Sequence, residues 1–138
     1  MENQKAKNRM WISLNLVSFI FLLLLFYLGK YNQWKSVYII GSIAALLVFI
    51  VSVYTGFIKT NFWKIVHSTS KNLDEREVSI VLKAVKYSYS IFAILCIILI
   101  YVLAFTHFIM VDVVLGGGLL YLAHILPAAV VGWNEKIV

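Results

Sequence analysis

Four long apolar runs constrain this chain more than any other feature of its sequence. They cover about 11–29, 36–58, 87–106 and 109–133, and each can form a helix of about 20 residues that crosses a bilayer. Backbone groups in lipid have no water to bind, so a spanning segment must be a helix or part of a closed barrel. The runs lack the inside–outside alternation of barrel strands. The sequence therefore predicts four transmembrane helices.

The composition excludes an ordinary soluble domain. Of the 138 residues, 62% are hydrophobic and only 13% are charged, and the mean hydropathy is +0.91. Soluble domains average about half apolar and about a quarter charged residues. A chain this short cannot bury so much apolar surface in a core of its own. We therefore expect a single integral membrane domain over 1–138, with the lipid bilayer as its main surroundings.

The connections between the runs predict how the helices are arranged. The first two runs, and the last two, are joined by short turns, which place successive helices side by side and antiparallel. The segment 59–86 is the only sizeable polar part, and no glycine or proline occurs between Gly56 and Gly116. A helix that begins near Leu73 is therefore expected to continue into the third span. The predicted fold is an all-α, up-down four-helix bundle whose third helix extends into the cytoplasm.

The basic residues predict which way the bundle is oriented. The N-terminal segment and the segment 59–86 together carry nine Lys and Arg residues, whereas the opposite side carries only Lys30 and Lys35. Cytoplasmic segments of membrane proteins carry an excess of these residues, so both termini are expected in the cytoplasm. The basic residues that give the chain its net charge of +6 flank apolar runs. They therefore indicate contact with anionic lipid headgroups, and no nucleic acid partner is expected.

The densest charge cluster lies between the second and third spans. Asn72 is a candidate N-cap, and Glu75 stands three residues later in the capping-box position. The first interpretation is a capped, solvated helix start, where the helix dipole favours the acids. The second is a docking site for a partner, formed by Asp74, Glu75, Arg76 and Glu77. Its main support is that Asp74, Arg76 and Glu77 have no ion-pair partner at helical spacing.

Asp112 and His124 are candidates for a transport path through the fourth run. A carboxylate inside a span usually faces the bundle interior or water, and a histidine suits a proton relay. Alternatively, Asp112 lies near the outer interface. There it would cap the helix start or pair with Lys30, Lys35 or His107, while His124 would be neutral and bonded within the bundle. The two are twelve residues apart, about 18 Å along a helix, and cannot touch.

The fourth run also contains Gly116, Gly117, Gly118 and Pro127, residues that weaken or interrupt helices. The triplet could form a hinge, a broken span or a close-packed pore wall. It could also simply be a tight helix crossing, where small residues let backbones approach. In each case the proline predicts a kink in the fourth span.

The sequence contains no pattern that indicates catalysis or metal binding. The single cysteine, Cys96, lies inside an apolar run, so no internal disulfide can form. No nucleophile–base–acid set, paired-cysteine motif, zinc-protease motif or calcium loop is present in the sequence. We therefore expect a protein that is not an enzyme and that uses no cofactor or metal.

From Lys59 through Ser90 the sequence resembles a family of small four-span bacterial inner-membrane proteins. In that family, a loop containing Phe-Trp and His leads to a Leu-Asp-Glu-Arg-Glu motif, here Leu73 to Glu77. A Ser-Tyr-Ser sequence, which begins here at Ser88, then opens the third span. The resemblance implies a multi-pass protein of the bacterial inner membrane. It brings no activity with it, so none is assigned.

The leading hypothesis for function is an accessory, scaffold or regulatory subunit of a membrane complex, which would act as a homo-oligomer or with a partner membrane protein. The charge cluster would be its docking site. The alternative hypothesis is a small oligomeric channel or transporter that uses Asp112 and His124. A bundle of four helices has little room for a pore, so the alternative requires an oligomer.

Overall fold

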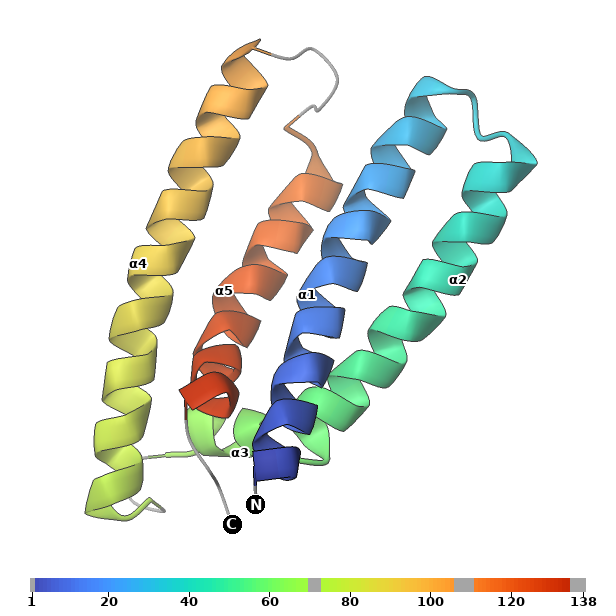
Figure 1. Ribbon diagram of the computed structural model, residues 1–138. Coiled ribbons are helices and arrows are strands. Elements are labelled where there is room, and N and C mark those ends of the chain that lie inside the picture. The colour runs from blue at the N-terminus through green and yellow to red at the C-terminus, as the bar shows by residue number, and fades with distance from the viewer. Residues whose placement is uncertain (1, 70–72, 106–110, 135–138) are drawn as a thin grey trace.

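The computed structural model describes residues 2–69, 73–105 and 111–134 (Figure 1). Within these ranges the chain is helical and contains no strand, which confirms the predicted all-α fold. The elements are α1 (Glu2–Tyr31), α2 (Ser36–Val53), the π-helical turn η1 (Tyr54–Ile58), α3 (Phe62–His67), α4 (Glu75–Phe105) and α5 (Val113–Asn134).

The four long helices run up and down in a bundle, as predicted. In Figure 1, α4 and α2 are the outer helices, with α5 and α1 between them. Helix α1 packs against both α2 and α5, and α4 packs against α5. The short helix α3 lies below α5 and α1, at the same end as the start of α1 and the end of α5. We call this the α3 end of the bundle, and the opposite end, where α1 turns into α2, the turn end.

Four helices are long and apolar enough to cross a membrane: Asn3–Tyr31, Ser36–Ile58, Glu75–Phe105 and Val113–Asn134. This arrangement is that of a multi-pass membrane protein. The expected spans agree closely with these helices at most of their ends. They differ at the start of the first and fourth helices.

Helix α1 begins at Glu2, and not near residue 11 where the apolar run starts. Its first turns contact the other terminus of the described chain. Lys5 Nζ donates a hydrogen bond of 3.3 Å to the carbonyl of Asn134, and Arg9 Nε donates one of 3.1 Å to that of Trp133. The last carbonyls of a helix lack intrahelical partners, and cations there are favourable. The polar N-terminal segment therefore supplies two cations that bind the end of α5.

The second span ends in the π-helical turn η1, and the chain then folds back as α3, which was not predicted. In η1 the backbone N–H of Lys59 donates to the carbonyl of Tyr54, five residues earlier, at 2.9 Å. Gly56 allows η1 to approach α1 closely, because a β carbon there would lie 3.5 Å from Cβ of Trp11. Asn61, in the left-handed conformation with φ of 60°, then redirects the chain into α3.

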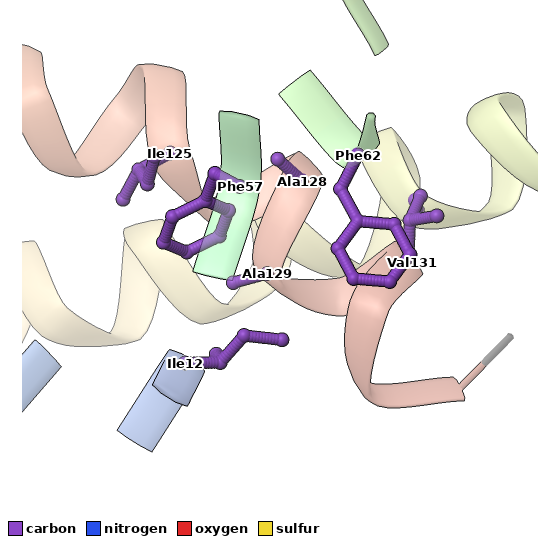
Figure 2. Close-up of a cluster of buried hydrophobic side chains, with 8 residues drawn as sticks. Ile12, Phe57, Phe62, Ile125, Ala128, Ala129 and Val131 are labelled. Carbon is purple, nitrogen blue, oxygen red and sulfur yellow. The ribbon is translucent and has the colours of Figure 1, made fainter. Parts of the chain in front are cut away.

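The tightest apolar core lies at the α3 end. Figure 2 shows side chains from four elements that gather there: Ile12 from α1, Phe57 from η1, Phe62 from α3, and Ile125, Ala128, Ala129 and Val131 from α5. Helices within lipid gain little from apolar burial alone, because lipid tails are as apolar as the side chains. Helix α3 is not one of the spans, so burying Phe62 there removes apolar surface from water. That burial stabilises the fold by about 1.5–3 kcal/mol.

Helix α4 is longer than the hydrocarbon is thick, which fits the predicted extension. Its 31 residues measure about 46 Å at about 1.5 Å per residue, whereas the hydrocarbon core is about 30 Å thick. With Phe105 at one face of the hydrocarbon, the other face would fall near Lys86. Helix α4 is also the least buried of the four: only 6% of its most apolar stretch is buried, against 33% in α1 and in α5. It is thus the most exposed of the four candidate spans.

Candidate functional site

Asp112 lies immediately before α5, at its N-terminus, and not inside the fourth span. The backbone N–H of Leu115 donates to Oδ1 at 3.1 Å, and the Tyr27 hydroxyl donates to the same oxygen at 2.8 Å. Lys30 Nζ lies 3.3 Å from Oδ2 and forms an ion pair with it. The expectation of a helix from residue 109 was therefore wrong for residues 111 and 112, because Asp112 caps the helix from outside. His107, another candidate partner, lies outside the described residues.

These contacts fix the charge of Asp112. The hydrogen bond from the Leu115 backbone, then that from Tyr27, and then Lys30 hold the pKa of the carboxyl below its ordinary value of 3.8. A group that takes up and releases protons during transport at neutral pH needs a pKa near that pH. Asp112 is therefore ionised at neutral pH, and it joins α1 to the start of α5 at the turn end.

His124 lies in the middle of α5, and its ring approaches α3. Its Nδ1 is 2.8 Å from the carbonyl of Leu120, and its ring centroid is 6.3 Å from that of His67, with the two rings within 3° of parallel. His67 in turn stacks on Trp63 at 3.9 Å. Sequence reasoning missed this neighbour because it did not predict α3. No third potential metal ligand joins the two histidines within the described ranges.

The two candidate transport residues therefore do not form one site. Asp112 contacts α1 at the turn end, and His124 contacts α3 near the opposite end. Three cavities of the described chain all lie at the α3 end, and neither residue lines any of them. Transport through these residues stays a prediction, without a described cavity that connects them.

A buried polar network that the sequence did not predict joins α1, α2 and α5. Asn15 Nδ2 donates to Ser52 Oγ at 3.0 Å, and the Tyr121 hydroxyl donates to Asn15 Oδ1 at 2.7 Å. Ser52 donates onward to the carbonyl of Phe49 at 2.7 Å. Asn15 and Ser52 are fully buried. Polar side chains in lipid bond across helices because the alternative is an unpaired group. The one feature of the sequence that could have indicated this network is Asn15, an amide side chain inside the first apolar run.

The glycine triplet forms a tight helix crossing at only one of its three positions. A β carbon at Gly118 would lie 3.1 Å from Cζ of Phe19, so this glycine lets α5 approach α1. Gly116 and Gly117 would meet no atom within 4 Å. Helix α5 runs without a break through the triplet and Pro127. The structure therefore favours the crossing and not the broken span.

The charge cluster begins α4 with a capping box, shifted from the predicted position. Asp74 is the N-cap: its carbonyl accepts from Val78 N–H at 2.9 Å, and its Oδ1 accepts from Glu77 N–H at 2.6 Å. Glu77 Oε2 accepts in return from the Asp74 N–H at 3.1 Å. Both acids therefore have local partners that the search for ion pairs did not find, because these partners are backbone N–H groups. Asn72, the predicted cap, lies outside the described residues.

Beyond the cap, α4 carries an apolar row, half-buried at its first residue and exposed at the other two, that we call the α4 stripe. It consists of Val78, Leu82 and Val85. Leu82 is 65% exposed and Val85 is 46% exposed. These positions are spaced i, i+4 and i+7, so they share one helix face. Ala84, which is buried against the bundle, lies on the opposite face. Glu75 and Lys86 flank the stripe and are exposed.

Comparisons of the chain with models of protein families, with curated proteins and with solved structures found no match. The resemblance of the segment from Lys59 to Ser90 to four-span bacterial proteins therefore stays a prediction.

Proposed function

We propose that this protein is an accessory subunit, with a scaffold or regulatory role, in a complex of the bacterial inner membrane. The observation that carries the proposal is the α4 stripe. Apolar side chains are expected to be exposed where a helix faces lipid, but the stripe precedes the hydrocarbon boundary near Lys86. An exposed apolar row outside the lipid is typical of a surface that another protein covers.

The spacing of the stripe fits recognition of a helix by a groove or by a second helix. Anchors at i, i+4 and i+7 are the pattern that such partners read. Glu75 and Arg76, two members of the charge cluster, are exposed at the start of the same helix and would set the charge of the rim. Asp74 and Glu77 support the site indirectly, because they fix where α4 begins.

The proposed orientation places the α3 end in the cytoplasm. This end carries the basic residues at the start of α1, in α3 and in the first part of α4, whereas the turn end carries Lys30 and Lys35. An excess of Lys and Arg on the cytoplasmic side is the rule for multi-pass proteins. The α4 stripe would then meet a cytoplasmic segment of a neighbouring membrane protein.

Site-specific crosslinking in native membranes tests the proposal. A photoreactive residue at position 82 should capture a second polypeptide that co-purifies in a fixed ratio with the protein. The same residue at position 83, on a different face of α4, should not capture it. The variant Leu82→Ser with Val85→Ser should lose the partner from mild-detergent purifications, whereas Lys83→Ala should keep it.

Two results would contradict the accessory role. Crosslinks from position 82 to lipid alone would show that the stripe lies in the bilayer. Crosslinks only to a second copy of this chain would replace the accessory subunit by a homo-oligomer. Substitution of Asp74 or Glu77 is a poorer test, because either change also weakens the start of α4.

A further inference from the structure

A polar cavity of about 610 Å³ opens at the α3 end, between the start of α1 and the segment that links η1 to α3. Helix α1 contributes Gln4, Lys7, Asn8 and Trp11 to its wall. These residues are spaced i, i+3, i+4 and i+7, so a single face of α1 is turned towards the cavity. The proposed docking surface on α4 takes no part in it.

The cavity follows from how α1 and η1 cross. At the crossing, Gly56 brings η1 into van der Waals range of the Trp11 backbone. On the side away from the membrane centre, the π-helical turn and the left-handed Asn61 lead the chain aside into α3. The space left between them is lined on this side by Thr55, Lys59 and Asn61.

The chemistry of the wall indicates an anionic ligand. Two cations, Lys7 and Lys59, face the cavity from opposite sides, and no acidic residue is among its lining residues. Among the described side chains, neither lysine forms an ion pair with an acidic residue. The amides of Asn8 and Asn61 add hydrogen-bond donors. Ammonium and amide donors together match the oxygens of a phosphate.

The position of the cavity indicates where the phosphate comes from. Lys59 directly follows Ile58, the last residue of the second span, and Trp11 begins the first apolar run. Tryptophan is enriched at the level of the lipid headgroups, and basic pockets between helices at that level bind anionic lipids. We infer that this cavity binds the phosphate group of an anionic phospholipid, with Lys7 and Lys59 as its cationic contacts.

Lipid retention by the full-length protein tests the inference. The protein is purified from nanodiscs that contain phosphatidylglycerol and phosphatidylcholine, and bound lipid is counted by native mass spectrometry. The double variant Lys7→Gln with Lys59→Gln should bind phosphatidylglycerol about 25-fold more weakly, since each lysine near an anionic headgroup contributes roughly fivefold. The control, Lys83→Gln with Lys86→Gln, removes the same charge from α4, away from the cavity. Because only Lys86 lies near the headgroups, the control should bind the lipid at most about fivefold more weakly than the original protein.

Four results of these lipid-binding measurements would contradict the proposed phospholipid site. Unchanged retention by the Lys7 and Lys59 variant, or an equal loss in the α4 control, would show that the cavity is not the site. Equal binding of phosphatidylcholine would show that charge does not select the ligand. Displacement of the lipid by inorganic phosphate at matching concentration would assign the cavity to a soluble phosphate. Equal melting temperatures of the two double variants show that a difference in folding does not explain the result.

Discussion

Gly132 gives the sharpest test of the packing at the α3 end. It lies in α5, where α1 and α3 meet that helix, and it is buried. A β carbon at this position would lie 2.6 Å from Cδ1 of Ile12 and 2.7 Å from Cε2 of Phe62. Both side chains are only 1% exposed, so neither can move out into solvent. The substitution Gly132→Ala should therefore force the core apart.

The magnitude follows from a comparison with a second glycine of the same helix. Overpacking a close-packed core costs about 1–3 kcal/mol. Replacing glycine by alanine inside a helix stabilises the helix by about 1 kcal/mol, which partly offsets the cost of overpacking. Gly117→Ala should gain the same helical term without a clash, because no atom lies within 4 Å of its β carbon. The difference between the two variants is thus the overpacking term, about 1–3 kcal/mol.

The assay is reversible unfolding of the purified protein in mixed detergent micelles, followed by circular dichroism. Gly132→Ala should unfold at a lower fraction of denaturing detergent than Gly117→Ala. Adding Ile12→Val to Gly132→Ala removes the methyl group nearest the new β carbon, so part of the loss should be recovered in a non-additive way. If Gly132→Ala is as stable as Gly117→Ala, the close packing of α1, α3 and α5 described here is wrong.

Two further substitutions test the polar contacts. Asn15→Leu leaves the Tyr121 hydroxyl without its buried acceptor, so unfolding in the same assay should be about 1–2 kcal/mol easier; an unchanged free energy would mean that the network is not formed. Because the pKa of Asp112 is lowered in the folded state, its ionised form stabilises the fold above the ordinary carboxyl pKa, and that contribution is lost as the pH falls below 3.8. The stability gap between the original protein and Asp112→Asn should therefore close in acid, and a gap independent of pH would contradict the contacts described.

The spans and their order could be predicted because they depend on local composition. A run of about 20 apolar residues must be a helix in lipid whatever surrounds it. The extension of α4 was predictable for a similar reason, since no glycine or proline interrupts it. The contacts of the first residues of α1 were not, because Lys5 and Arg9 bind carbonyls at Trp133 and Asn134, at the far end of the described chain. Sequence patterns do not show which distant segment supplies such a contact.

The candidate sites were harder to predict because the role of each residue depends on the groups to which it is hydrogen-bonded. Asp112 was expected inside the fourth span, because that span was predicted to begin near residue 109. Helix α5 begins after Asp112, so this residue is a helix cap. Asp74 and Glu77 lacked side-chain partners at helical spacing, yet each bonds the backbone of the other. Asn15 could be noticed in the sequence, but its partner Tyr121 lies 106 residues away.

The interactions divide the bundle into a fixed part and an outer helix. The Asn15 network and a cluster of three rings join α1, α2 and α5, with Tyr121 placed 4.9 Å from Phe19 and 5.1 Å from Phe49. Helix α4 contributes only Ala84 to the buried core at the α3 end. A partner on the opposite face of α4 would therefore leave the joined helices undisturbed. On the proposed accessory role, α4 would present this face to a partner while its packing against α5 stays unchanged.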